Sequence, residues 1–406
     1  MIQITKKLDF GSQVKILEKC IANNLDLKNE LDCRGFDYDN LIYRHKQPIH
    51  LNYFSTYITP DDYEFRNCGI PAVSFFSGAG GLDLGFKYAG FQHLASVEIN
   101  PIFCETLRKN FPNSAILGPP DCSGDVRNRD EIVTALKEKV GINSPFEGVF
   151  VGGPPCQSFS VAANQRFSKA GENFKRTGFL NIEYGNLLFE FVWYICQFKP
   201  RVFLIENVTG LLGIDGGKQV AAAVEMLQNS GYAVTEPTVL NAADYGVPQN
   251  RSRLFLSGWR TPANFTFPQP EAFAVPCYKA LEKPLINAEN HVTREHKAES
   301  VIRYIELKYG ERDCLGRVDR LDPNLPAKTV IAGGSKGGGR SHLHPLIPRT
   351  LSVRESARLQ TFPDSFIFCG SPARGFTQVG NAVPPLLALK LARTLCTKIY
   401  GIIKLP

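Results

Sequence analysis

The sequence predicts an α/β fold with a doubly wound, mostly parallel sheet and a second, smaller domain. From Ala72 onward, short apolar β-prone runs alternate with segments of helix length. This alternation is the pattern expected of a parallel sheet flanked by helices. After Trp259 the alternation stops, and about 85 residues rich in prolines, charges and glycines follow. This change in sequence pattern and composition predicts the second, smaller domain.

The first βαβ unit is expected where the alternation begins. Residues 72–76 (AVSFF) predict a strand, a glycine turn follows, residues 82–89 predict a short helix, and HLASV predicts a second strand ending before Glu98. The later elements are expected as strands at 147–151, 201–205 and 253–259, and as helices at 187–197, 220–229 and 352–360. An apolar helix beginning near Val383 should return to the first domain.

These elements divide the chain into four parts. Residues 1–70 carry mixed charge and no clear periodic pattern, and we interpret them as an extension of unknown role. The main domain is expected at 71–261, the smaller module at 262–348, and a C-terminal segment that returns to the main domain at 349–406.

Composition narrows the class of protein. Of 406 residues, 43% are hydrophobic and 21% are charged, as in ordinary globular proteins. The 11 cysteines include no CxxC pair, which argues against a zinc site and against a disulfide framework, so we expect no metal. No apolar run approaches the roughly 20 residues of a membrane span, and no secretory signal is present, so a cytoplasmic protein is expected. A net charge of +7 permits a polyanionic partner.

The segment FSGAGGLDLGF predicts a cofactor site at the first strand-to-helix turn. Gly78, Gly80 and Gly81 let the chain turn tightly and let a ligand approach the backbone. Glu98 ends the second strand, where a carboxylate can accept hydrogen bonds from ribose hydroxyls. Asp125 is a candidate for the adenine amino group. These features do not separate a nicotinamide cofactor from S-adenosylmethionine. The alternative without a cofactor is a glycine turn that only connects strand and helix tightly, and an aspartate exposed in a loop.

Three further segments carry reactive groups. Cys156 follows a predicted buried strand and two prolines, which places a thiol at the carboxyl end of the sheet, although most single cysteines are inert core residues. Glu206 follows the strand 201–205 at the same edge; the alternative is a helix cap. Arg251 and Arg253 are two residues apart at the beginning of a strand, so their side chains lie on the same face. That face is either part of a binding site or the exposed face of an edge strand.

The ordered motifs FSGAGG, VEINP, GGPPCQSFS, IENV, QNRSR, RESARLQTFPD and QVGNAVPP resemble the motif series of cytosine-C5 DNA methyltransferases. The resemblance runs from about Val73 to the C-terminus. It implies a Rossmann-like, S-adenosylmethionine-dependent enzyme of the prokaryotic restriction-modification type, with S-adenosylhomocysteine as product. It further implies a monomer that acts on double-stranded DNA beside a restriction endonuclease cutting the same site.

The chemistry of cytosine methylation assigns roles to these residues. Cytosine C5 is a poor nucleophile, so the ring must first be activated by addition of a thiolate at C6, the role of Cys156. Glu206 would donate a proton toward N3, and burial would favour its protonated form. Arg251 and Arg253 would hold the base and stabilise developing charge. Because C6 is inaccessible in a stacked duplex, the base must be flipped.

The resemblance also assigns binding residues. The methyl-donor pocket is expected at Phe76, Ser77, Gly78, Ala79, Gly80, Gly81, Leu82, Glu98, Ile99, Asp125, Val126, Pro155, Leu187, Asn381, Ala382 and Val383. DNA contacts are expected at Gln157, Ser160, Arg166, Lys169 and Arg340. Residues 161–184 are polar and basic, as in a loop closing over DNA, or simply as in a solvated loop. The module at 262–348 corresponds to the target-recognition region.

Competing functions share only part of this pattern. A nicotinamide oxidoreductase would explain the glycine turn and Glu98 but has no use for PPCQ, ENV and QNRSR in this order. Adenine-N6 and cytosine-N4 methyltransferases carry an Asp/Asn-Pro-Pro-aromatic motif, whereas this chain has Pro-Pro-Cys. A tRNA cytosine-C5 methyltransferase with the same catalytic set is the main alternative, and the large recognition module disfavours it.

Overall fold

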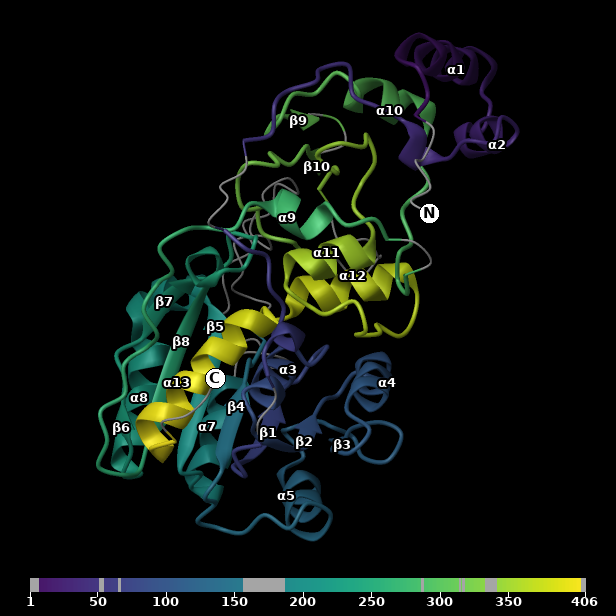
Figure 1. Cartoon of the computed structure of the whole chain (residues 1–406). Coiled ribbons are helices and arrows are strands. Elements are labelled where there is room, and N and C mark those ends of the chain that lie inside the picture. The colour runs from purple at the N-terminus through teal and green to yellow at the C-terminus, as the bar shows by residue number, and fades with distance from the viewer. Residues whose placement is uncertain are drawn as a thin grey trace. The chain divides into compact units, whose positions relative to one another are not determined.

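The computed structural model describes residues 7–50, 55–64, 67–155, 187–285, 288–313, 315, 318–332 and 342–402. The chain divides into two compact units that interleave along the sequence (Figure 1). The first comprises Met1–Tyr57, Gly246–Asn250 and Phe273–Asn381, and the second comprises Ile58–Tyr245, Arg251–Ala272 and Ala382–Pro406. Among the described residues, no helix is both long and apolar enough to cross a membrane.

The second unit is built on one sheet. Its described strands are β1 (Pro71–Phe75), β2 (Gln92–Val97), β3 (Ala115–Leu117), β4 (Val149–Gly152), β5 (Val202–Val208), β6 (Ala233–Val234), β7 (Thr238–Asn241) and β8 (Ser252–Trp259). They run in the order β3-β2-β1-β4-β5-β8-β6, and β7 also pairs with β8. The strands from β3 to β5 are parallel, and β8 is antiparallel to its neighbours. The predicted doubly wound, mostly parallel sheet is confirmed.

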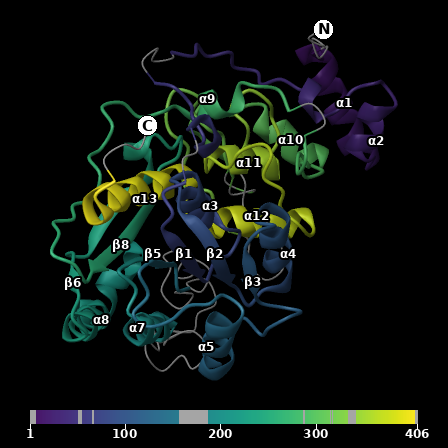
Figure 2. The same cartoon turned by 60° about the horizontal axis from the view of Figure 1, so that its bottom comes forward.

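Helices cover both faces of this sheet (Figure 2). They are α3 (Gly81–Tyr88), α4 (Pro101–Asn110), α5 (Arg129–Glu138), α7 (Leu187–Phe198), α8 (Lys218–Asn229) and α13 (Pro385–Tyr400), with short 3-10 helices η2 (Pro60–Asp62), η5 (Thr209–Gly217) and η6 (Ala242–Tyr245). Val73 and Phe75 point into a core shared with α5, α7 and α8. Ser74, between them, points the other way and bonds to α3. The C-terminal helix α13 packs on α3.

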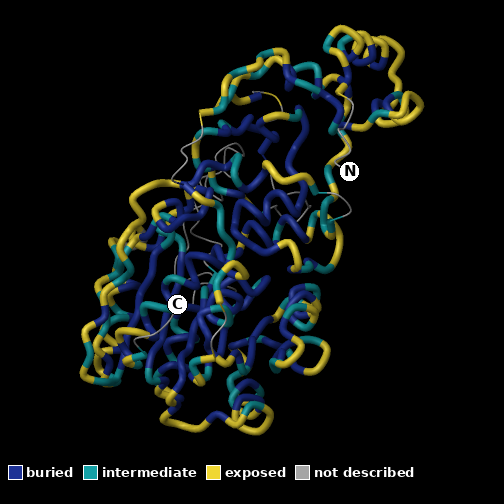
Figure 3. Tube along the Cα trace, viewed as in Figure 1, coloured by how far each residue is buried: buried dark blue, intermediate teal, exposed yellow. Residues whose placement is uncertain are grey.

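Buried positions follow this layering. In Figure 3 the central strands of the sheet are dark blue, whereas β6 and β7 are mostly intermediate or exposed, as are the outer helices and loops. Phe75 is fully buried and packs against Phe150 and Phe191, with ring centroids 5.1 Å apart in each pair. The apolar runs that predicted the strands are therefore the strands that form the core.

One predicted boundary differs from the structure in a way that matters for the site. The sequence predicted a strand ending at Ile205, but β5 continues through Val208. The extension is held by antiparallel pairing with β8, which joins Glu206 to Phe255 and Val208 to Arg253. Local sequence did not show this pairing, because it depends on a strand some 50 residues away. Glu206 is thus a strand residue with a fixed direction.

The first unit contains the N-terminal helices that the sequence analysis missed. Its described elements are α1 (Phe10–Asn23), α2 (Leu27–Asp32), η1 (Tyr38–Asn40), α9 (Cys277–Leu281), α10 (Ala298–Tyr304), α11 (Val353–Leu359), α12 (Pro372–Asn381), β9 (Arg312–Asp313) and β10 (Val318–Asp319). Asp9 caps α1 through the Ser12 amide, and Asp26 caps α2 through the Asn29 amide. The helices are short, so their periodic pattern was hard to recognise.

Candidate active site

The glycine turn between β1 and α3 has the tight geometry that the sequence predicted. Phe76 has a φ of 54°, and Gly80 has a φ of 84°. Glycine adopts this left-handed conformation freely, whereas a phenylalanine there is strained, and such strain clusters at ligand sites. The turn delivers the first backbone amides of α3 to the carboxyl edge of the sheet, where α/β proteins bind ligands.

Glu98 closes this turn from the end of β2. Its Oε2 accepts the Gly78 amide at 2.7 Å, and its Oε1 accepts the Asn100 amide at 2.8 Å. Burial raises the pKa of the Glu98 carboxyl, while these two amide hydrogen bonds act in the opposite direction. The neighbouring Ile99 is 52% exposed, an unusual position for a large apolar side chain beside a buried carboxylate. A carboxylate beside an apolar platform suits a ribose with an attached flat base.

Asp125 and Val126 lie in the loop before α5. Arg127 donates to both carboxylate oxygens of Asp125, with Nε to Oδ1 at 2.9 Å and Nη2 to Oδ2 at 2.8 Å. The hydrogen bond from Arg127 lowers the pKa of Asp125, so this carboxylate is a charged acceptor at neutral pH. Val126 is fixed from below, because the buried Tyr194 hydroxyl donates to its carbonyl at 2.9 Å.

The remaining predicted pocket residues that the structure describes fall in different places. Leu82 on α3 and Leu187 at the start of α7 are buried. Val383 lies against the glycine turn, since a Cβ on Gly81 would come within 2.2 Å of the Val383 carbonyl oxygen. Asn381 ends α12 in the first unit, whereas Ala382 and Val383 belong to the second.

A buried ion pair joins β5 and β8. Glu206 is 8% exposed, and its Oε1 lies 3.1 Å from Arg253 Nε. Arg251, 1% exposed, is close enough to act on the same carboxyl. Burial raises the pKa of Glu206, and Arg253 and then Arg251 oppose that rise. The alternative of two arginines exposed on an edge strand is wrong, because β8 is flanked by β5 on one side and by β6 and β7 on the other.

The loop leading to Cys156 is held against Glu206 and its neighbour. A Cβ on Gly153 would lie 2.6 Å from Glu206 Oε2, so the carboxyl occupies the space that any side chain at this position would need. Asn207 Nδ2 donates to the Pro154 carbonyl at 3.2 Å, and both atoms are buried. Asn207 Oδ1 also accepts the Val208 amide at 2.8 Å. The chain two residues before Cys156 is therefore tied to β5.

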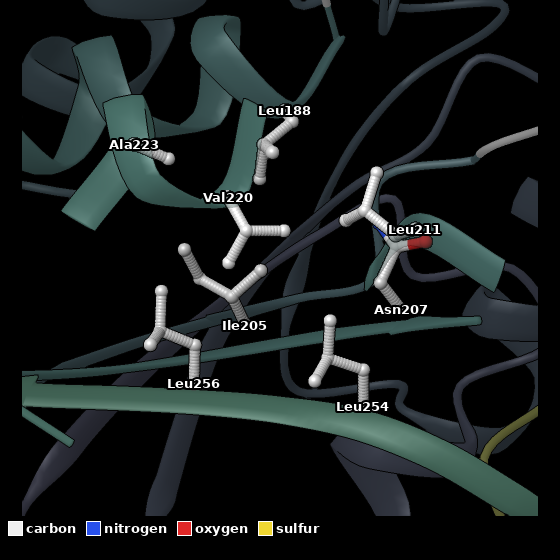
Figure 4. Close-up of a pocket in the computed structure, with 8 residues that line it drawn as sticks. All are labelled: Leu188, Ile205, Asn207, Leu211, Val220, Ala223, Leu254 and Leu256. Carbon is white, nitrogen blue, oxygen red and sulfur yellow. The ribbon is translucent and has the colours of Figure 1, made fainter. Parts of the chain in front are cut away.

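A small cavity of about 20 Å³ lies behind this contact (Figure 4). It is lined by Leu188, Ile205, Asn207, Leu211, Val220, Ala223, Leu254 and Leu256. Asn207 is the polar member of that set, and the other side chains are aliphatic. A space of this size holds about one water at most, so it is a packing defect beneath the site and no substrate pocket.

Several predicted residues lie outside the described part of the chain. These are Cys156, Gln157, Ser160, Arg166, Lys169 and Arg340. Pro155 is the last described residue before Cys156. The predictions for these residues stay predictions.

Sequence reasoning missed two buried polar residues next to the predicted ones. Asn207 sits in ENV and Gln249 sits in QNRSR, but only the charged members of those motifs were chosen. Gln249 is fully buried in the first unit, where Nε2 donates to the Leu359 carbonyl at 3.2 Å and Oε1 accepts the Val330 amide at 2.8 Å. For Asn207 the available signal was a polar amide next to an apolar run, because such groups are buried only when their hydrogen bonds are satisfied; Gln249, in GVPQNRSR, has no such signal.

The fold and these contacts define an α/β protein with a tight glycine turn and a buried carboxylate-arginine cluster at one sheet edge. Comparisons with known proteins narrow the class. A model of the C-5 cytosine-specific DNA methylase family matches residues 70–397. The chain belongs to this family, and the predicted enzyme class, DNA (cytosine-5-)-methyltransferase, is confirmed. Membership implies a methyl donor of the S-adenosylmethionine type, which the turn, Glu98 and Ile99 suit.

Individual relatives agree. The chain is 35% identical to the type II methyltransferase M1.HphI of Haemophilus parahaemolyticus, over 79% of this chain and 85% of the relative. It is 33% identical to the type II methyltransferase M.MthTI of Methanothermobacter thermautotrophicus, over 82% and 98%. Among solved structures, a protein described as a DNA modification methyltransferase encoded within an E. coli prophage is similar at 25% identity, with a TM-score of 0.67 and coverage of 82% and 99%.

Proposed function

We propose that this enzyme transfers a methyl group to C5 of a cytosine that is flipped out of a specific double-stranded DNA sequence, through a covalent bond between Cys156 and C6. One observation carries the proposal. The buried Glu206–Arg253 pair at 3.1 Å lies against Gly153, and Asn207 ties the next residue, Pro154, to the same strand. An acid, its cationic partner and the approach to the only cysteine in the GGPPCQ motif therefore share one edge of the sheet.

The proposed reaction uses these groups in order. The Cys156 thiolate adds to C6, and the electron pair of the C5–C6 double bond is displaced onto the ring toward N3. The protonated Glu206 carboxyl donates a proton or hydrogen bond at N3, which stabilises that charge. C5 then forms a bond to the methyl group that S-adenosylmethionine supplies, with S-adenosylhomocysteine as the other product. Loss of the C5 proton and departure of the Cys156 thiolate restore the double bond and release 5-methylcytosine.

Arg253 and Arg251 have two tasks in this scheme. Burial raises the pKa of Glu206, and the positive charges of Arg253 and Arg251 oppose that rise. Their remaining donors would bind the carbonyl oxygen of the base and stabilise charge that develops there. A preorganised cluster of this kind needs no rearrangement during the reaction.

The methyl-donor pocket is proposed on the same residue set as the sequence predicted. Glu98 would accept the ribose hydroxyls with the lone pairs that Gly78 and Asn100 leave available. The exposed side chain of Ile99 would pack against the adenine ring. Asp125 would accept the adenine amino group beside Arg127, with the Val126 backbone next to it.

DNA recognition is proposed for the region 262–348, with flipping of the target base into the site and with Gln157, Ser160, Arg166, Lys169 and Arg340 near the duplex. The curated relatives named above are type II methyltransferases. We therefore propose that this enzyme also protects the sites of a companion restriction endonuclease, working as a monomer on DNA in the cytoplasm.

A tRNA substrate is the second candidate, because tRNA cytosine-C5 methyltransferases use the same set of catalytic residues. The experiment is to incubate the enzyme with radiolabelled S-adenosylmethionine and either duplex DNA or tRNA, and then to map methylated cytosines by sequencing. The proposal predicts label in DNA at C5 of one cytosine in a recurring sequence. Label in tRNA alone would reject the DNA assignment.

A further inference from the structure

The N-terminal segment, residues 7–50, precedes the part of the chain that the family model matches, yet it is built into the first unit. Helix α1 lies beside α10, and α2 lies beside α1 (Figure 1). The shared core contains Leu8, Ile16, Leu17, Cys20, Leu27, Leu31, Tyr38 and Leu41 from the segment, and Ala298, Val301 and Ile305 from the α10 region. A buried core of this size is the mark of a permanent part of a folded unit and argues against a detachable tail.

Beyond that core, the segment makes polar contacts with residues 295–309 and with Asn324, and it also contacts the 342–351 hairpin. In this hairpin the His344 amide donates to the Arg349 carbonyl at 2.8 Å, and Leu343 pairs with Thr350. The hairpin begins directly after the glycine-rich stretch 333–341 in the sequence and ends at the cap of α11. The hairpin therefore leads directly into α11.

Tyr43 holds one strand of the hairpin. Its hydroxyl donates to the His344 carbonyl at 2.8 Å in a buried position. The Arg320 guanidinium lies over the Tyr43 ring at 3.5 Å and over the Tyr309 ring at 4.3 Å. From there Arg320 donates to the Pro345 carbonyl through Nε at 2.9 Å and Nη2 at 2.7 Å. Two successive carbonyls of the hairpin are thus held by Tyr43 and by the arginine that stacks on it.

Asp39 holds the other strand. Its carboxylate pairs with Arg349, whose side chain is 2% exposed. Arg349 also makes a two-point contact with Glu355 of α11, with Nη1 to Oε2 at 2.8 Å and Nη2 to Oε1 at 2.9 Å. A buried cation between two carboxylates has a narrow range of positions, because moving it leaves a charge without a partner. Asp39 therefore fixes where the hairpin meets α11.

The charge of the segment indicates that it acts on the protein and not on the phosphate backbone. Between residues 7 and 50 there are seven lysines or arginines and seven aspartates or glutamates, so the net charge is zero. A surface that neutralises phosphates needs an excess of positive charge. The contacts of Tyr43 and Asp39, in contrast, are made to the His344 carbonyl and to Arg349.

We propose that residues 7–50 are a structural part of the DNA-recognition unit, in which Asp39 and Tyr43 are positioning residues that fix the 342–351 hairpin and thereby affinity and sequence choice for DNA. The inference rests on the proposed function, because it takes DNA as the substrate. It gives a role to the segment that lies outside the family match.

The test uses three variants of the full-length enzyme. Tyr43→Phe removes the hydrogen bond to His344 and keeps the ring under Arg320. Asp39→Asn keeps the size of the side chain and removes its charge from Arg349. Glu18→Gln, at an exposed position on α1, is the matched control. For each enzyme, kcat and KM for DNA, the ratio of methylation at the mapped site to sites altered by one base pair, the dissociation constant for S-adenosylmethionine and the thermal midpoint are measured.

We expect KM for DNA to rise about fivefold in each of the two test variants, the effect of losing one buried hydrogen bond or charge contact, with weaker discrimination against altered sites. The kcat at saturating DNA, methyl-donor affinity and the control should stay within twofold of wild type. Unchanged KM and site choice in both variants would overturn the inference, whether or not the thermal midpoint falls. Equal losses in kcat and methyl-donor affinity would also overturn it. A wild-type enzyme that does not methylate DNA would reject the proposed function instead.

Discussion

Gly153 offers a direct test of how the loop before Cys156 is fitted to the acid. A Cβ at this position would lie 2.6 Å from Glu206 Oε2, where ordinary contacts begin near 3.4 Å, so Gly153→Ala must displace the carboxyl by about 0.8 Å. Glu206 cannot yield freely, because Arg253 Nε holds its other oxygen at 3.1 Å in a buried site. A misplacement near 1 Å at a reacting centre costs roughly 100-fold in rate. We therefore expect kcat to fall about 100-fold.

The assay is a single-turnover methylation of DNA at saturating methyl donor, which measures the chemical step. Gly213→Ala is the matched control, because a Cβ there would meet no atom within 4 Å. Affinity for S-adenosylmethionine should be unchanged in both variants, since the glycine turn and Glu98 are not touched. A Gly153→Ala enzyme within about threefold of the wild-type rate would refute the argument that this glycine is required for the position of Glu206.

Three further predictions follow from the charges and hydrogen bonds of the two units. Because Arg253 lowers the pKa of Glu206, Arg253→Met should raise that pKa, and the loss of kcat at alkaline pH should then begin at a higher pH. If kcat falls at the same alkaline pH as in the wild type, Glu206 is not the proton donor. Asn207→Ala removes the hydrogen bond to the Pro154 carbonyl, and we expect kcat to fall about tenfold with unchanged methyl-donor affinity. A variant with wild-type kcat would show that this hydrogen bond does not position the loop. Burial lowers the pKa of both His296 and His344 from 6.5 to about 4, so the unfolded state binds these protons first as pH falls. Each of the two should lower the free energy of unfolding by about 2 kcal/mol between pH 7 and pH 5, and urea unfolding with equal midpoints at both pH values would contradict this.

The sequence was sufficient for the parts of the fold that depend on local pattern. The alternation of apolar runs located the parallel strands β1, β2 and β4 and the antiparallel strand β8, because strands buried on both faces are apolar along most of their length. The glycine turn was also predictable from local sequence, because glycine readily adopts the positive φ angles that several positions of the turn require. The rule that ligand groups gather at the carboxyl edge predicted where Glu206 lies, but it did not bring the arginines there, because the start of a strand reaches that edge only when the strand is antiparallel, as β8 is.

What could not be predicted depends on contacts between distant residues. Asp39 and Arg349 are 310 positions apart, and neither the ion pair nor the hairpin that it fixes has a local signature. The two units also interleave within one short motif, since Gln249 belongs to the first and Arg251 to the second. The end of β5 was misjudged because its last residues are held by β8 and not by their own apolar character. Cys156 was predicted from motif and chemistry; it lies outside the described residues, and its role stays a prediction.

The central claim is that Cys156 bonds to C6 of a flipped cytosine while Glu206 supplies the proton. Duplex DNA in which the target cytosine carries fluorine at C5 tests it most directly, because C5 then has no proton to lose and the enzyme cannot release the thiolate after methyl transfer. With methyl donor present, intact-mass analysis should show a one-to-one covalent complex, mapped by proteolysis to Cys156 and absent in Cys156→Ser. An enzyme that methylates ordinary DNA but forms no covalent complex with the fluorinated duplex would contradict the mechanism.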